Sequence, residues 1–378
     1  MNKFVIKCLF VLLMFYQCKA QNKVSIPPSP YFFINTIESQ RQYVKAVGFS
    51  NRGNSYQFMD LRGYLDTNNV LIKKQNKENV IEFQWLLINN VVNSAQISKD
   101  IKHNKSPFKD NYKSWVSLSE RSMFNQEVPL YEGYSFYYIT QFLYYTKING
   151  WSGASLQNKK KWYELLSFIE TNIWTKWYER SFKEKGNYYY YFLGRRTHMG
   201  SHWAGIAMYL NKLSDDTHII NQTAIMLNQY DILLKRNLQK KEKGYIWNST
   251  YDNVEGTFAY MDKGNQIQDV SHGNHVVTYI VAAYEMENEN WTFEDIKRLS
   301  YTLKEFIYNN EKVKFYDNVD GTDRKVNSGR ENFIGDGWVK LANYDKGVKH
   351  IFEKFDKIDR TRKFNQELQF KANLYYSY

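Results

Sequence analysis

The sequence predicts an all-α protein built as an incomplete ring or barrel of α-hairpins, with short β-hairpins on one rim. Three observations support this prediction. First, a loop rich in glycine and polar residues leads into a short apolar helix four times, near Glu132, Gly200, His272 and Asp336. These starts recur about 70 residues apart, as in a degenerate repeat. Second, longer amphipathic helices alternate with the apolar ones. Third, aromatic extended stretches precede the last three apolar helices, and such stretches favour short strands.

The elements can be placed in chain order. A helix is expected over residues 78–98, and inner apolar helices are expected over 134–145, 203–213, 274–285 and 338–344. Outer helices are expected over 159–185, 215–240 and 291–310, and short strands over 188–192, 245–248 and 313–316. In the first outer helix, Trp162, Leu165 and Ile169 fall at three- and four-residue intervals, which is one stripe of a surface helix. Each inner helix should therefore pair with an outer one.

Residues 1–20 are expected to be an export signal rather than part of the fold. Lys3 and Lys7 accompany an apolar stretch over 8–16 that is too short to span a bilayer. The residues that begin at Cys18 resemble the start of bacterial outer-envelope lipoproteins, in which Cys18 would be the lipidated residue. The alternative is ordinary cleavage after Ala20. We therefore expect an exported protein, in the periplasm or on the outer membrane of a bacterium. Membrane contact is expected only through a lipid anchor at Cys18, and residues 21–378 are expected to form a single catalytic domain.

The amino-acid composition limits the kinds of partner and bonding that can be expected. Cys8 and Cys18 are the only cysteines, so no internal disulfide and no cysteine-based metal site or nucleophile is expected. The net charge of +12 favours an anionic partner, either an acidic polysaccharide or the envelope surface, and export argues against nucleic acid. Aromatic residues make up 17% of the chain and could line a sugar-binding groove, although a large helical core would also use them. We expect a monomer without a cofactor.

Two short segments, 195–203 and 269–275, hold four of the seven histidines. Histidine has the side-chain pKa nearest neutrality, so such clusters are where proton transfer should be sought. In a ring of α-hairpins the starts of the inner helices converge on one face. The residues expected to meet there are Glu132, His198, His202, His272, His275 and Asp336. Capping of helices explains Ser201 and Ser271 but not the histidines.

These segments resemble those of a known enzyme family. The run Trp203-Ala204-Gly205 after a polar helix start, and a second His-Asn cluster opening a later inner helix, look like the (α/α)-toroid polysaccharide lyases, especially alginate and related uronan lyases. The resemblance covers roughly residues 125–345. Gly200-Ser201-His202 stands where the alginate lyases have Asn-Asn-His. The family's catalytic tyrosine lies later in the chain, where this sequence has Tyr260 and, slightly beyond it, His272.

The resemblance implies cleavage of a uronate-containing polysaccharide by β-elimination. In such lyases the uronate carboxylate is neutralised, a base removes the C5 proton and an acid protonates the departing O4. It implies Asn274 with Arg195 or Arg196 at the carboxylate, His202 or His272 as base, and Tyr260 or His275 as proton donor. The other candidates for substrate binding are His198, Trp203, Glu132 and Arg330.

Three alternatives remain open. The first alternative is a zinc site. It is suggested by the spacing of two histidine pairs, which places each pair on one helical face: His198 with His202, and His272 with His275. No glutamate stands beside either pair. An inverting glycosidase would need two carboxylates, for which Glu132, Asp269 and Asp336 are available. The third alternative is a non-catalytic, glycan-binding lipoprotein.

Overall fold

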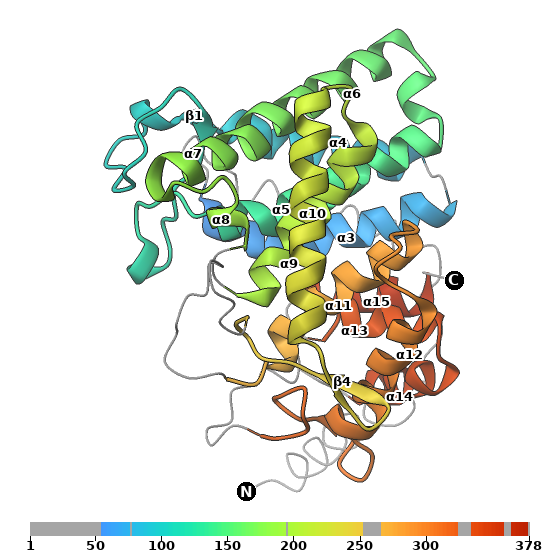
Figure 1. The fold of residues 1–378 in the computed structure, drawn as a ribbon. Coiled ribbons are helices and arrows are strands. Elements are labelled where there is room, and N and C mark those ends of the chain that lie inside the picture. Colours follow the sequence, from blue (N-terminus) through green and yellow to red (C-terminus); the bar gives the residue numbers. More distant parts are fainter. Residues whose placement is uncertain are drawn as a thin grey trace, which may run out of the picture.

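The structure is a computed structural model that describes residues 54–75, 78–193, 196–251, 266–323, 334–358 and 364–376. Within these ranges the chain is mostly helical, with only short antiparallel strand pairs, as the sequence predicts (Figure 1). The expected export signal and Cys18 lie outside the described residues. None of the described helices is long and apolar enough to cross a membrane.

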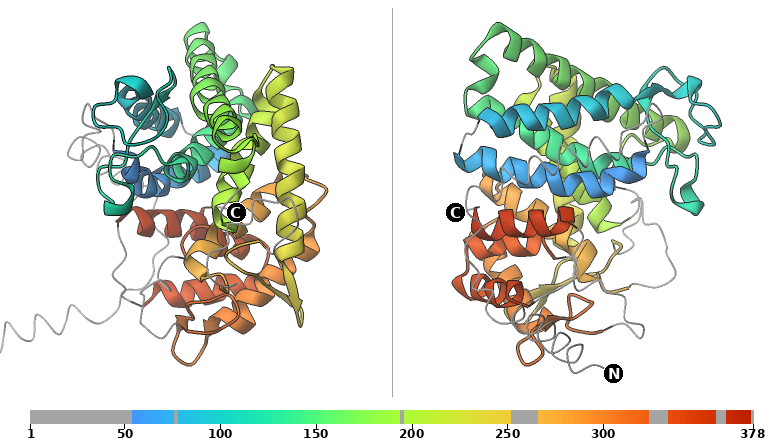
Figure 2. Two further views of the ribbon diagram at one scale, coloured as in Figure 1. Left: turned by 60° about the vertical axis from the view of Figure 1, so that its left-hand side comes forward. Right: turned by 180° about the vertical axis from the view of Figure 1, so that it is seen from behind.

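One set of helices forms a closed circuit of contacts. Its members are α3 (Phe58–Gln75), α5 (Pro129–Ile148), α9 (Thr197–Leu213), α11 (Val270–Glu285), α13 (Gly337–Lys340) and α15 (Phe364–Tyr375). Each helix in this order contacts the next, and α15 contacts α3. The last contact brings the two ends of the described chain together, and Figure 2 shows α15 lying beside α3 when the molecule is seen from behind.

A second set of helices covers the first. Its members are α4 (Glu78–Ser94), α6 (Leu156–Ile169), α10 (Thr217–Asn237), α12 (Phe293–Tyr301) and α14 (Lys346–Asp356), which contact α3, α5, α9, α11 and α13 respectively. A π-helical segment, Glu170–Thr175, joins α6 to α7 (Lys176–Lys185), and a second one, Thr302–Ile307, follows α12. The alternation of apolar and amphipathic helices in the sequence therefore corresponds to an alternation between helices of the circuit and helices of the second set.

Three short hairpins accompany the helices. They pair β1 (Gln96–Ile97) with β2 (Lys113–Ser114), β3 (Gln239–Lys241) with β4 (Gly244–Ile246), and β5 (Tyr308–Asn309) with β6 (Lys314–Phe315). Two of the expected strands lie in β4 and β6. The strand expected over 188–192 is wrong, because these residues lead into the short helix α8 (Tyr190–Leu193), where Phe192 stacks on Trp174 with ring centroids 4.7 Å apart. Tertiary packing of this ring overrides the β-propensity of the aromatic run.

Helix α3 has no counterpart in the sequence prediction, and its polar middle explains why. Asp66, Thr67, Asn68 and Asn69 are consecutive and buried, so α3 presents no simple apolar stripe. Each has a partner: Thr67 bonds the Gly63 carbonyl, whereas the other three bond residues distant in sequence. These distant partners are Lys340, Gln369 and Asn373 for Asp66, Gln84 for Asn68, and Gln84, Gln141 and the Tyr138 carbonyl for Asn69.

The starts of α5, α9, α11 and α13 meet at one end of the circuit. A Cβ atom added to Gly133 would lie 3.3 Å from Cβ of His202, which shows how closely α5 approaches α9 there. A Cβ atom on Gly337 would lie 2.0 Å from the carbonyl oxygen of Asn274, so α13 approaches α11 with no room for a side chain. This end of the circuit is where the histidine segments lie.

Candidate functional site

The two histidine segments form one cluster. The ring centroid of His198 lies 4.3 Å from that of His272 and 6.3 Å from that of His275, and the rings of His202 and His275 are 4.6 Å apart. His198 and His202 belong to α9, and His272 and His275 belong to α11. The cluster thus joins side chains from neighbouring helices that are distant in sequence.

Both helices begin earlier than the sequence predicts, so His198, His202 and His272 lie within helices rather than in the loops before them. His275 lies within α11, as expected. Helix α9 starts at Thr197, whose backbone N–H donates to the Ser249 carbonyl and whose hydroxyl donates to Gln268. Helix α11 starts at Val270, and the carboxylate of Asp269 caps it by accepting the backbone N–H of His272. The expectation that Ser271 caps this helix is therefore wrong.

His272 is the accessible member of the cluster. Its side chain is 28% exposed, whereas His198, His202 and His275 are each 3% exposed. Nδ1 of His272 lies 2.8 Å from Oδ2 of Asp269. Because a carboxylate can only accept, Nδ1 carries a proton, and in the neutral ring Nε2 is the nitrogen with the lone pair. This is the arrangement of a histidine prepared to act as a base.

The three inner histidines are held in the neutral form. Burial lowers the pKa of His198, His202 and His275 well below 6.5, and positive charge nearby lowers it further. Nδ1 of His198 and Nε2 of His202 are buried and have no hydrogen-bond partner among the described residues. Buried polar atoms without partners are uncommon in folded proteins, so these two nitrogens are candidates for contact with a ligand.

Two further residues complete the cluster, and neither is among the residues predicted from the sequence. Arg62 on α3 is half-buried, with Nη1 2.7 Å from Nε2 of His275, and its guanidinium carbon lies 4.8 Å from the ring centroid of Tyr134 on α5. The Tyr134 ring lies 4.5 Å from that of His202 and 5.3 Å from that of His275. Tyr134 opens an expected inner helix, so the repeat pattern could have found it, but no local signal marks Arg62.

Asn274 and Asp336 connect α11 to α13 beneath the histidines. The side-chain oxygen of Asn274 accepts the backbone N–H of Trp338 at 3.0 Å, and Asn274 is 3% exposed. Asp336 accepts hydrogen bonds from the hydroxyls of Tyr138 and Thr278, and its Oδ2 lies 3.4 Å from Nδ1 of His275. Both side chains hold helices together at the site.

Two predicted binding residues have other roles. The carboxylate of Glu132 is fully buried, bonds Ser114 and Trp177, and pairs with Lys176 at 2.8 Å. Burial raises the pKa of Glu132, and Lys176 opposes this shift. Glu132 thus has its contacts on the α7 side of α5, and the structure corrects its placement in the site. Trp203 is 1% exposed and packs on Phe192, so it is a core residue rather than a surface for a sugar ring.

The remaining candidates lie at the edge of the described chain or outside it. Arg196 directly precedes α9, is half-buried, and its positive charge contributes to lowering the pKa of His198. Arg195, Tyr260 and Arg330 lie outside the described residues.

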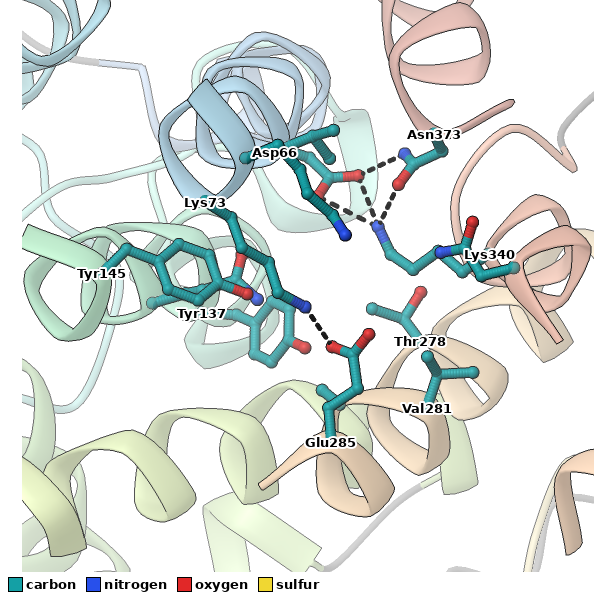
Figure 3. A pocket seen from close by; sticks show the side chains of 14 residues that line it. Asp66, Lys73, Tyr137, Tyr145, Thr278, Val281, Glu285, Lys340 and Asn373 are labelled. Atoms are coloured by element: carbon teal, nitrogen blue, oxygen red, sulfur yellow. Dashed lines mark hydrogen bonds and ion pairs between the residues drawn. The ribbon is translucent and has the colours of Figure 1, made fainter. Parts of the chain in front are cut away.

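Two observations concern other sites. In the described part of the chain, no group of three or more His, Cys, Asp or Glu residues is arranged to hold a metal ion. A pocket of about 40 Å³, the space of roughly two or three water molecules, is lined by residues that include members of α3, α5, α11, α13 and α15 (Figure 3). Its walls carry the Lys73–Glu285 and Lys340–Asp66 ion pairs, and no predicted site residue lines it. The histidine cluster is therefore the better candidate for chemistry.

Comparisons with known protein families, with curated proteins and with solved structures find no match for this chain.

Proposed function

We propose that this protein is a polysaccharide lyase that cleaves an anionic, uronate-containing polysaccharide by β-elimination. The observation that carries the proposal is the meeting of neutral imidazoles, a guanidinium and a phenol in one cluster around His202 and His275. Proton removal beside a carboxylate needs a neutral base, a positive charge to stabilise the developing carbanion, and a proton donor for the leaving oxygen. The cluster contains all three kinds of group.

In the proposed reaction, Nε2 of His272 removes the C5 proton of the uronate. The electron pair forms the C4–C5 double bond as the C4–O4 bond breaks, and the hydroxyl of Tyr134 donates a proton to the departing O4. The uronate carboxylate is held by Arg62, whose guanidinium keeps further N–H donors beyond the one directed at His275. Arg196 stands beside His198 as a second cation for the same carboxylate.

The proposed fold is an (α/α) toroid. Two observations support a toroid. The helix contacts form a closed circuit from α3 to α15, and a further helix packs on each of the first five helices of that circuit. In such a toroid the starts of the inner helices surround a central cleft, and the histidines lie at those starts. The net charge of +12 suits an acidic polysaccharide. Export to the periplasm or outer membrane, a lipid anchor at Cys18 and a monomeric state remain predictions.

The glycosidase alternative finds less support, because the available carboxylates are already engaged. Glu132 pairs with Lys176, Asp336 accepts from Tyr138 and Thr278, and Asp269 holds His272. An inverting glycosidase needs one carboxylic acid and one carboxylate free to act on opposite sides of the bond. No pair of these three meets that requirement.

The test incubates the purified full chain with alginate, polygalacturonate, hyaluronan and chondroitin sulfate, and follows both ultraviolet absorbance and new reducing ends. Elimination produces both signals, because each cleavage leaves an unsaturated uronate. We expect His272→Ala to abolish the absorbance signal, and His218→Ala, which removes an exposed histidine on α10, to leave it unchanged. Reducing ends without absorbance would establish a glycosidase. Binding without either product would establish a non-catalytic glycan-binding protein.

A further inference from the structure

We infer that His275 is a positioning residue that holds Arg62 in place, and not the proton donor that its sequence context predicts. The inference rests on the proposed function for its catalytic meaning, but the charge state of His275 can be measured without any substrate. The inference follows from the charged and titratable side chains that face His275 from the neighbouring helices.

The strongest argument is the position of Arg62. A guanidinium has only hydrogen-bond donors and keeps its charge at all relevant pH values. Its Nη1 lies 2.7 Å from Nε2 of His275 in a site where His275 is 3% exposed. Protonating the ring would place a second positive charge at that distance with little solvent to screen it. A proton donor must begin as the imidazolium and a base must become one, so His275 is unsuited to either role.

The other groups around His275 do not offset this repulsion. His198 and His202 on α9 are neutral, and Asp269 is engaged by His272. Asp336 lies 3.4 Å from Nδ1 of His275, but it accepts from Tyr138 and Thr278, and Nζ of Lys340 lies 3.7 Å from its Oδ1. The charge of Asp336 is thus shared with the ammonium of Lys340, and Nη1 of Arg62 also lies 3.3 Å from Nδ1 of His275.

His275 therefore connects two parts of the site. On one side stands Asp336, at the start of α13, and on the other Arg62, whose guanidinium lies over the ring of Tyr134 at 4.8 Å. A flexible arginine side chain loses much conformational freedom when it is fixed in this way. Holding it in advance spares the substrate that entropic cost, and it fixes the positive charge beside the phenol that we propose as proton donor.

The test compares His275→Gln with His275→Ala. The glutamine amide oxygen reaches the place of Nε2 and can accept from Arg62, but glutamine cannot carry a proton at any working pH. We expect His275→Gln to keep kcat/KM within about tenfold of the wild type, with an unchanged pH profile, and His275→Ala to lose more than about a hundredfold. If His275 transferred the proton, the glutamine variant would lose about 10²- to 10⁴-fold as well, and the inference would be wrong. His272→Gln serves as the matched control that removes a proposed proton carrier.

A second measurement keeps the inference testable if the variants do not fold or if no substrate is found. Nitrogen NMR follows the imidazole nitrogens of the wild-type protein as the pH is lowered to about 5. The signals of His275 are assigned by comparison with Arg62→Met, because the titration of His275 should move to higher pH in that variant. We expect His275 to stay neutral throughout in the wild type. Protonation of His275 near 6.5, the ordinary histidine value, would overturn the inference. Failure to detect elimination on any polysaccharide would instead overturn the proposed function and leave this result intact.

Discussion

Oδ2 of Asp269 lies 2.8 Å from Nδ1 of His272, and Oδ1 of the same carboxylate accepts the backbone N–H of His272 at 3.0 Å. One side chain therefore both caps α11 and orients the partly exposed histidine of the cluster. The two tasks can be separated by mutation, because asparagine caps a helix as well as aspartate does but carries no charge to stabilise an imidazolium.

We accordingly predict that Asp269→Asn lowers kcat by about a hundredfold or more while changing the melting temperature little. The matched control is Asp216→Asn, since Asp216 caps α10 in the same manner by accepting the backbone N–H of the exposed His218. The control should leave both turnover and melting temperature unchanged. Steady-state kinetics and circular dichroism provide the two measurements. An Asp269→Asn variant with full activity would remove His272 from the proposed mechanism.

The buried histidines predict a loss of stability at mildly acidic pH. Because the pKa of His198, His202 and His275 is lowered in the folded state, the unfolded chain binds protons first as the pH falls below 6.5. The free energy of unfolding is therefore greatest above 6.5 and should fall by up to about 1.4 kcal/mol per pH unit for each such histidine. Urea unfolding between about pH 5 and pH 8 measures the slope.

A variant tests which residues cause that slope. His202→Asn should reduce it by about the contribution of one proton, whereas His218→Gln, which changes an exposed histidine, should not alter it. Equal slopes in the wild type and in His202→Asn would show that the acid sensitivity has another origin.

The buried pair of Glu132 and Lys176 predicts a non-additive effect on stability. Both side chains are fully buried, and Nζ of Lys176 lies 2.8 Å from the Glu132 carboxylate. Lys176→Met alone should cost about 3–5 kcal/mol, because it leaves a buried carboxylate without its cation. The double variant Glu132→Gln/Lys176→Met should recover part of that loss in urea unfolding.

The same double variant also tests the corrected role of Glu132. Since its carboxylate faces Lys176 and Trp177, the folded double variant should keep polysaccharide cleavage close to the wild-type rate. A large loss of cleavage in a well-folded double variant would return Glu132 to the active site and would favour the glycosidase alternative.

The packing of α5 against α9 predicts that Gly205 cannot be replaced. A Cβ atom at this position would lie 1.9 Å from Cε2 of Tyr137, whose ring is buried. Gly205→Ala should therefore destabilise the protein by about 1–3 kcal/mol or more, as overpacking in a core does. At Gly153 an added Cβ meets nothing within 4 Å, so Gly153→Ala is the matched control and should be close to neutral. Thermal unfolding of the two variants distinguishes these outcomes.

The sequence by itself determined the helical class and most of the helices near the site. Apolar periodicity is a local property, so it correctly located much of α5, α9, α10 and α11. The histidine clusters were also visible as local patterns, and the recurrence of helix starts led to the expectation that they would meet. Helix boundaries were less well predicted, because the cap of α11 is Asp269 rather than a serine.

Only the tertiary structure decided which groups surround the histidines. Arg62 lies on α3, whose polar middle is stabilised chiefly by partners such as Gln84 and Lys340 that are distant in sequence, so no local pattern reveals the helix. The sequence predicts Glu132 as a site carboxylate, but Lys176 lies against it in the structure. The sequence also predicts His275 as a proton carrier, but Nη1 of Arg62 lies 2.7 Å from its Nε2. The physical reason is the same in each case. The charge state and role of a buried side chain depend on the groups that desolvate and face it, and folding brings those groups from distant parts of the chain.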